Sequence, residues 1–72
     1  MSGKYIYESH LGGLYAVEHP IPDEHLYCET CGDYDDLVGY AESKSKARKL
    51  LKHYDFDPKY LREFLKNNFE EG

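Results

Sequence analysis

The order of the secondary-structure signals is the feature that most constrains the fold of this chain. Strand-like segments fill its first half and helix-like segments fill its second. Residues 4–8 and 14–18 consist largely of tyrosine and aliphatic residues that suit a pleated sheet. Gly12 and Gly13 lie between these segments and favour a tight turn, so we expect a β-hairpin.

A second hairpin is expected after a proline-containing loop. Pro20 and Pro22 interrupt the first hairpin, because a proline cannot donate a hydrogen bond to a sheet ladder. Residues 25–28 and 37–41 are then predicted to form two more strands. We expect these strands to pair with each other, with the two cysteines at the bend between them.

Two helices are expected after residue 42. Ser43 is a favourable helix N-cap, and Asp57 followed by Pro58 is a typical start for a second helix. Both segments have apolar residues at the spacing of one helical face: Ala47, Leu50, Leu51 and Tyr54, then Leu61, Phe64, Leu65 and Phe69. Strands followed by helices predict the α+β class, here a small antiparallel β-sheet of two hairpins (ββββ) with two C-terminal α-helices packed on one face.

The length predicts a single domain over residues 1–72, made of a β-hairpin region (1–42) and a two-helix region (43–69). Such a short chain buries only about 60% of the surface that it exposes when unfolded. We therefore expect modest stability, which a metal or a partner chain would increase. The chain has neither an apolar run near the roughly 20 residues of a membrane span nor a secretory signal, which predicts a cytoplasmic protein that does not contact membranes.

Charge is distributed unevenly along the chain. The net charge of −5 disfavours general affinity for nucleic acid or anionic lipid. Residues 1–42 hold one lysine and nine acids, whereas residues 43–72 hold eight basic residues and five acids. Two interpretations remain open. The two halves could form two faces with different partners, or the negative charge of the sheet could be compensated by the positive charge of the helices that pack on it.

The strongest chemical signal is the pair Cys28 and Cys31, which is followed by Gly32. This spacing places two thiolates on one side of a tight turn, which is half of a zinc site. A closed site needs two more ligands, from this chain or from a second copy in a homodimer. His25 is the nearest candidate, but a strand would point its side chain to the face opposite Cys28. The other candidates are an aspartate, His10, His19 and His53.

Two further interpretations of the cysteine pair remain open. Cys28 and Cys31 could be reduced thiols at a hairpin bend, one of them packed in the core as a small hydrophobe. A thiol redox function is disfavoured, because aspartates follow the motif and their negative charge would raise the pKa of the thiols. In thioredoxin-like proteins a helix begins there and lowers the pKa of the thiol.

Two charged surfaces are candidate partner-binding sites. The first is an acidic hairpin tip that could meet a basic partner: Glu29, Asp33, Asp35 and Asp36. The second is the basic side of the first predicted helix: Lys44, Arg48 and Lys52. The helix could follow the phosphates of a nucleic acid. Both sets are also explained by solubility alone, since charged residues mostly lie on solvated faces.

The segment from Leu26 to Ala41, LYCETCGDYDDLVGYA, contains a YCxxCGDxD motif at the expected hairpin. This segment resembles small uncharacterised proteins of Firmicute bacteria and their prophages, and the resemblance extends over residues 5–52. It implies a bacterial cytoplasmic context and an accessory role of the prophage type. It implies no activity and no site residues.

These observations predict a small non-enzymatic protein that acts by binding another protein. No nucleophile motif or phosphate-binding glycine loop is present, and so short a chain rarely encloses a substrate pocket. The alternative is a structural-zinc module with a nucleic-acid-associated regulatory role, and a thiol redox protein is the third candidate. Zinc is the only cofactor that the sequence suggests.

Overall fold

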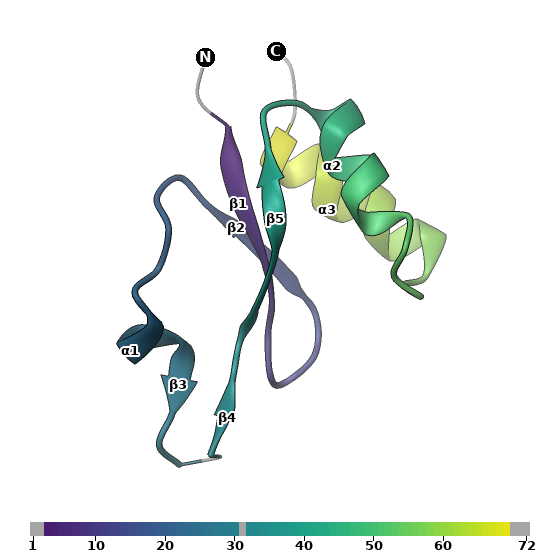
Figure 1. The fold of residues 1–72 in the computed structure, drawn as a ribbon. Coiled ribbons are helices and arrows are strands. Elements are labelled where there is room, and N and C mark those ends of the chain that lie inside the picture. The colour runs from purple at the N-terminus through teal and green to yellow at the C-terminus, as the bar shows by residue number, and fades with distance from the viewer. Residues whose placement is uncertain (1–2, 31, 70–72) are drawn as a thin grey trace.

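The structure, a computed structural model, describes residues 3–30 and 32–69. Two helices cover one side of a three-stranded sheet, and a short hairpin extends away from them at one end of the molecule (Figure 1). The elements are β1 (Lys4–Glu8), β2 (Leu14–Val17), α1 (Asp23–Leu26), β3 (Tyr27–Cys28), β4 (Asp33–Tyr34), β5 (Asp36–Ala41), α2 (Lys44–Leu51) and α3 (Pro58–Phe69). This arrangement confirms the α+β class and the antiparallel sheet followed by C-terminal helices.

The β1–β2 hairpin forms where the sequence predicts it. Gly12 and Gly13 in its turn have φ values of +94° and +93°, which glycine adopts without steric cost. The turn is closed by hydrogen bonds from the backbone N–H of Ser9 to the carbonyl of Gly13 and from the N–H of Gly12 to the carbonyl of Ser9, both at 2.9 Å. Helix α3 supports the hairpin, because the hydroxyl of Tyr60 accepts a hydrogen bond from the N–H of Leu14 at 2.6 Å.

The second hairpin differs from the expectation in its pairing. β3 pairs with β4 in a separate two-stranded sheet, and β5 pairs with β1 in the three-stranded sheet of order β2–β1–β5. The predicted pairing of residues 25–28 with residues 37–41 is therefore wrong. Pairing with β1 places Ala41 at the end of β5 in the core, fully buried, and apolar burial favours that arrangement.

The predicted strand over residues 25–28 is helical in its first half. His25 and Leu26 belong to the single turn of α1, and only Tyr27 and Cys28 are extended. Acidic residues occupy the first turn of α1 and a histidine its last, which suits the dipole of a helix.

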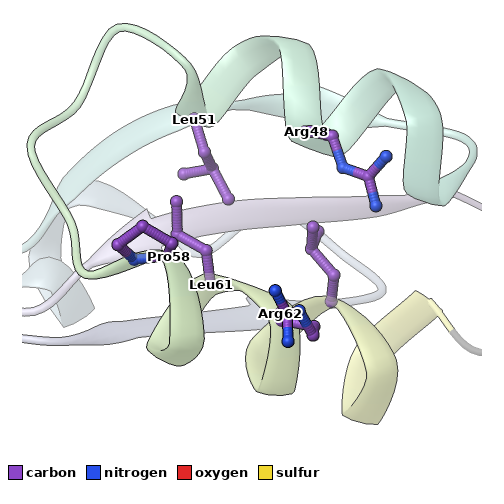
Figure 2. Close-up of a pocket in the computed structure, with 6 residues that line it drawn as sticks. Arg48, Leu51, Pro58, Leu61 and Arg62 are labelled. Atoms are coloured by element: carbon purple, nitrogen blue, oxygen red, sulfur yellow. The ribbon is translucent and has the colours of Figure 1, made fainter.

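The core lies between the three-stranded sheet and the two C-terminal helices. Its buried members are Ile6, Ala41, Ala47, Leu51, Phe64, Leu65 and Phe69. Leu51 of α2 and Leu61 of α3 lie between the two helices (Figure 2). The helical apolar positions expected from the sequence are buried or half-buried, except for Tyr54, which follows α2 and is 39% exposed.

Both helix starts are capped as predicted. The hydroxyl of Ser43 accepts a hydrogen bond from the N–H of Lys46 at 3.3 Å, and the carboxylate of Asp57 accepts one from the N–H of Lys59 at 3.1 Å. These bonds satisfy amide groups that have no partner inside the helix. Among the described residues, no helix is both long and apolar enough to pass through a membrane.

Tyrosine side chains form cross-strand pairs in the larger sheet. The rings of Tyr5 and Tyr40 lie 4.8 Å apart between centroids, and those of Tyr7 and Tyr15 lie 5.5 Å apart. The hydroxyl of Tyr7 accepts a hydrogen bond from the N–H of Ile21 at 3.0 Å, so the loop after β2 is fastened to this ring. Such pairs stabilise neighbouring strands beyond the burial of their area.

Candidate functional site

Asp35 occupies the joint between the two sheets. It is the single residue between β4 and β5, and its backbone N–H donates a hydrogen bond to the carbonyl of Leu26 at 3.1 Å. The carboxylate of Asp35 therefore lies where the β3–β4 hairpin meets the three-stranded sheet.

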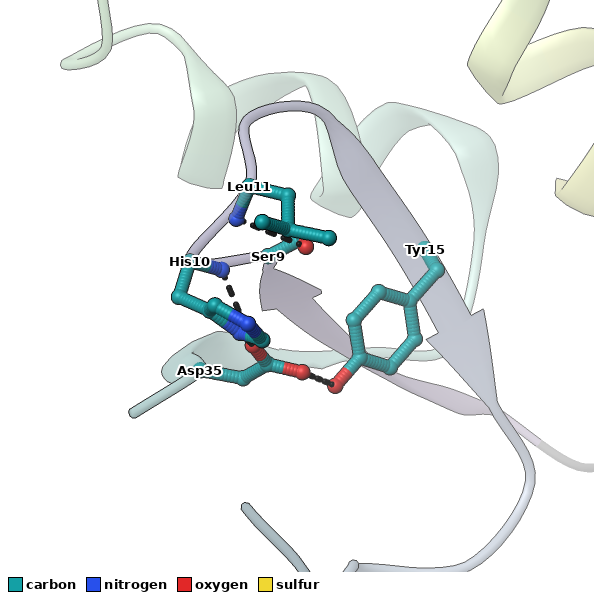
Figure 3. Close-up of polar contacts among 5 residues, drawn as sticks. All are labelled: Ser9, His10, Leu11, Tyr15 and Asp35. Atoms are coloured by element: carbon teal, nitrogen blue, oxygen red, sulfur yellow. Dashed lines mark hydrogen bonds and ion pairs between the residues drawn. The ribbon is translucent and has the colours of Figure 1, made fainter. Parts of the chain in front are cut away.

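Three donors converge on this carboxylate, and we call His10, Tyr15 and Asp35 the Asp35 network (Figure 3). The Nδ1 atom of His10 lies 2.6 Å from Oδ1 of Asp35, and the backbone N–H of His10 donates to the same oxygen at 2.9 Å. The hydroxyl of Tyr15 donates to Oδ2 at 2.5 Å. The side chains of His10 and Asp35 are only 15% and 17% exposed, so this ion pair is partly shielded from water.

The network shifts the pKa of each of its members. The hydrogen bond from Tyr15, followed by those from His10, lowers the pKa of Asp35 to about 2. The hydrogen bond with Asp35 is the main cause that raises the pKa of His10. Burial, and then the hydrogen bond to Asp35, raise the pKa of the Tyr15 hydroxyl. The ionised carboxylate and the protonated imidazole therefore stabilise each other.

Cys28 is a further neighbour of His10. A hydrogen bond and the charge of the Cys28 side chain are smaller contributions to the raised pKa of His10. Cys28 lies in β3 opposite Asp33, and its carbonyl accepts a hydrogen bond from the N–H of Gly32 at 2.7 Å. The φ of Gly32 is +72°, a backbone conformation that glycine adopts without steric cost.

The structure brings His10 close to Cys28, the cysteine of the motif that lies among the described residues. His25 is exposed on α1, and His19 and His53 are also exposed. In residues 3–30 and 32–69, no three side chains of His, Cys, Asp or Glu are placed to hold a metal ion together. Cys31, the second predicted thiol ligand, lies outside the described residues.

A surface hollow of about 490 Å³ adjoins the network, because Asp35 is also one of the residues that line it. We call it the acidic hollow, and it is lined by Asp23, Leu26, Tyr34, Asp35, Asp36 and Leu37. Tyr34 and Leu37 are 57% and 54% exposed, although both are large apolar residues. The ring of Tyr34 packs on that of Tyr27, with 5.0 Å between centroids, which fixes its position.

The predicted acidic residues divide between two environments. Asp35 is held in the network, whereas Asp33 and Asp36 are exposed, as is Glu29. No described residue forms an ion pair with these three exposed carboxylates. Their negative charge is therefore available to a partner.

The predicted basic residues of α2 also lie in different environments. Lys44 is half-buried at the helix start, and Lys52 is exposed at its end. Arg48 is exposed and lines a groove between α2 and α3 together with Arg62, a residue that the sequence reasoning did not select (Figure 2).

The sequence gives no local signal for the Asp35 network. His10 is 25 residues from Asp35 and Tyr15 is 20 residues from it, so the contacts depend on strand pairing. The Ser9–Gly13 turn positions His10 locally. A histidine in a tight turn is common and does not by itself indicate a site.

Comparison of the chain with protein-family models, with curated proteins and with solved structures finds no match. The function is therefore inferred from the side chains and their arrangement.

Proposed function

We propose that this protein is a non-enzymatic binding module that holds a basic segment of another protein in the acidic hollow. One observation carries the proposal: two large apolar side chains, Tyr34 and Leu37, are more than half exposed beside the carboxylates of Asp23 and Asp36. Exposed apolar residues that are surrounded by charge are typical of interaction surfaces.

The chemistry of the hollow fits a lysine or arginine side chain. The alkyl part of such a side chain would pack against Tyr34 and Leu37, while its cationic end reaches the carboxylates. A cation above the face of a tyrosine ring gains further electrostatic attraction. The partner is therefore a protein segment rich in basic residues, consistent with the accessory role that the sequence resemblance implies.

The Asp35 network supports this role by fixing the hollow in place. Asp35 is both a wall of the hollow and the acceptor of three hydrogen bonds from residues of the first hairpin. A wall held in this way loses little freedom when a partner binds, and such preorganisation increases affinity.

The proposal is tested with a fluorescently labelled peptide that contains alternating lysine and leucine residues. Tyr34→Ala and Asp36→Asn should each weaken binding by about tenfold, because each removes one of the two contacts that the hollow provides. Tyr54→Ala and Asp55→Asn are matched controls, since both residues are exposed in the α2–α3 loop, away from the hollow. Equal effects of the four substitutions would contradict the proposal.

A second candidate function, zinc binding, is favoured by the position of His10. A zinc-ligating histidine commonly donates its second ring N–H to a carboxylate, which orients the ring. The Nδ1 of His10 is held by Asp35 in this way, while its ring lies beside Cys28. We propose His10, Cys28 and Cys31 as three of the four ligands of a structural zinc ion, with Asp35 as the orienting group.

Native mass spectrometry of protein purified without chelator tests the zinc candidate. We expect one zinc ion per chain, and His10→Gln should weaken zinc binding whereas the control His25→Gln should not. Asp35→Asn should reduce the affinity by about 10- to 100-fold, as is usual for a carboxylate that orients a ligand. A metal-free protein would contradict this candidate, and one zinc ion per two chains would assign the ligands to a homodimer.

The nucleic-acid role predicted for a zinc module is tested by chromatography on immobilised DNA. Retention that falls as salt is added would support this role.

A further inference from the structure

A groove of about 280 Å³ separates α2 from α3 (Figure 2). Its apolar lining comes from both helices: Leu51 from α2, and Pro58, Leu61 and Leu65 from α3. Arg48 of α2 and Arg62 of α3 complete the lining. The groove thus combines an apolar floor with two cationic groups that come from different helices.

The two arginines lack a charge partner within the described part of the chain. Neither guanidinium forms an ion pair or a side-chain hydrogen bond with residues 3–30 or 32–69. By contrast, Lys46 on the same helix as Arg48 pairs with Glu42 at 3.0 Å. Arg48 and Arg62 therefore form a local positive site on a chain whose net charge is −5.

We propose that this groove, the arginine groove, binds an acidic segment of a partner protein. An apolar side chain of the partner packs against Pro58 and Leu61, above the buried Leu51, and carboxylates on either side of it pair with Arg48 and Arg62. Arginine suits this role, because its planar guanidinium can hold a carboxylate through two parallel hydrogen bonds.

The volume of the groove lies at the lower limit of the range for small-molecule sites. Sites for drug-sized ligands occupy about 300–1,000 Å³ and enclose most of the ligand. At about 280 Å³, the arginine groove accommodates an anchoring side chain of a larger partner. The groove between two helices also suits an amphipathic helix, which binds through apolar residues three or four positions apart.

The amount of charge disfavours the two other occupants. A nucleic acid would bring a dense row of phosphates to a chain whose net charge is −5, whereas an acidic segment brings only the few carboxylates that Arg48 and Arg62 can pair with. A second copy of this chain would bring its whole net charge of −5 against the same charge. This inference goes beyond the proposed function, because the arginine groove and the acidic hollow share no residue.

The test uses a fluorescently labelled helical peptide of about 14 residues, roughly four turns. Leucines occupy one face of the peptide, and glutamates flank them on both sides. Fluorescence anisotropy should show binding that falls by about tenfold in Arg48→Gln and in Arg62→Gln, the loss typical of a charged contact. A peptide with glutamine in place of glutamate should bind as weakly to the unaltered protein.

Lys49→Gln and Lys66→Gln are the matched controls. Both lysines are exposed on the same two helices, neither lines the arginine groove, and their substitution should leave binding unchanged. Circular dichroism verifies that all four variants remain folded. Equal losses in control and groove variants would show general electrostatic attraction and overturn the proposal.

Two other results would also overturn it. Duplex DNA that binds more tightly than the peptide, with the same dependence on Arg48 and Arg62, would assign the groove to nucleic acid. Self-association in sedimentation that disappears in Arg48→Gln and Arg62→Gln would assign it to a second copy of the chain. Binding at the acidic hollow is measured separately with the basic peptide. A negative result with one peptide therefore does not affect the result for the other surface.

Discussion

At the scale of single residues, Asp35 organises the end of the molecule where the proposed partner binds. Its two carboxylate oxygens accept hydrogen bonds from the backbone and side chain of His10 and from Tyr15. Since a short side chain reaches all these donors, its substitution affects the first hairpin and the joint between the sheets together. Asp36, its neighbour, makes no such contact with any described residue and serves as a natural comparison.

The first prediction concerns the pH dependence of stability in chelator-treated protein. The pKa of Asp35 is lowered to about 2, so its contribution is present above the unfolded value of about 3.9 and is lost as pH falls toward 2. The pKa of His10 is raised, so its contribution is complete below the unfolded value of about 6.5 and is lost as pH rises through the folded value.

Urea denaturation of the unaltered protein and of Asp35→Asn measures this contribution. The stability difference should be largest at about pH 5 and smaller at about pH 2 and pH 9, because the ion pair exists only between the two titrations. Asp36→Asn is the control and should show a much smaller dependence on pH. A difference for Asp35→Asn that stays constant from acid to alkaline pH would show that the ion pair with His10 does not contribute.

At the scale of elements, the helices depend mainly on local interactions. α2 begins at a serine cap, and α3 begins after an aspartate that bonds the second residue of the helix. The apolar face of each helix meets the sheet at helical spacing. This local character explains why both helices and their starts were predicted from the sequence, although the first was expected to include Tyr54 and ends at Leu51.

The second prediction tests the cap of α2. Ser43→Ala removes the hydroxyl that bonds the N–H of Lys46 and should lower the free energy of unfolding by about 1 kcal/mol. Ser45→Ala, two positions later in the same helix and exposed, should leave stability unchanged or raise it slightly, because alanine favours helix. Thermal and urea denaturation measure both. A loss in both variants of the same size would exclude a specific capping effect.

Strand pairing could be predicted only where a turn connects the two strands. The glycines at positions 12 and 13 determine the first hairpin, since only one short connection is possible. β5 instead pairs with β1, and nothing local distinguishes this from pairing with β3. In the observed pairing Ala41 is buried in the core with side chains of both helices, a contact between segments far apart in the sequence. For the same reason the acidic residues were predicted as a partner surface, but the Asp35 network was not.

At the scale of the whole molecule, few buried side chains hold the sheet and helices together. Ile6 from β1 and Leu51 from α2 are almost completely buried and both belong to the single core cluster of the described residues. A domain of this length is typically stable by roughly 0.05–0.15 kcal/mol per residue. The loss of one core contact is therefore a large part of the total.

The third prediction follows from this small core. Leu51→Ala should cost about 2–5 kcal/mol, because it leaves a cavity between the sheet and both helices. Much of the protein should then be unfolded at 37 °C, as seen by circular dichroism. Leu50→Ala is the matched control, since Leu50 is only partly buried at the edge of the core and should cost less. Equal costs would indicate that Leu51 is not central to the core.

The single-residue joint between β4 and β5 has a thermodynamic consequence. When a ligand binds only the folded state, its binding free energy is added to the free energy of every local opening that releases the ligand. Because Asp35 belongs to the acidic hollow and leads directly into β5, opening β5 would disrupt a filled hollow. Amide hydrogen exchange in β5 and in its neighbour β1 should therefore slow when the basic peptide binds, while exchange in α3 changes less. In this sense the joint links occupancy of the hairpin end to protection of the edge strand β5 and, through its pairing, of the central strand β1.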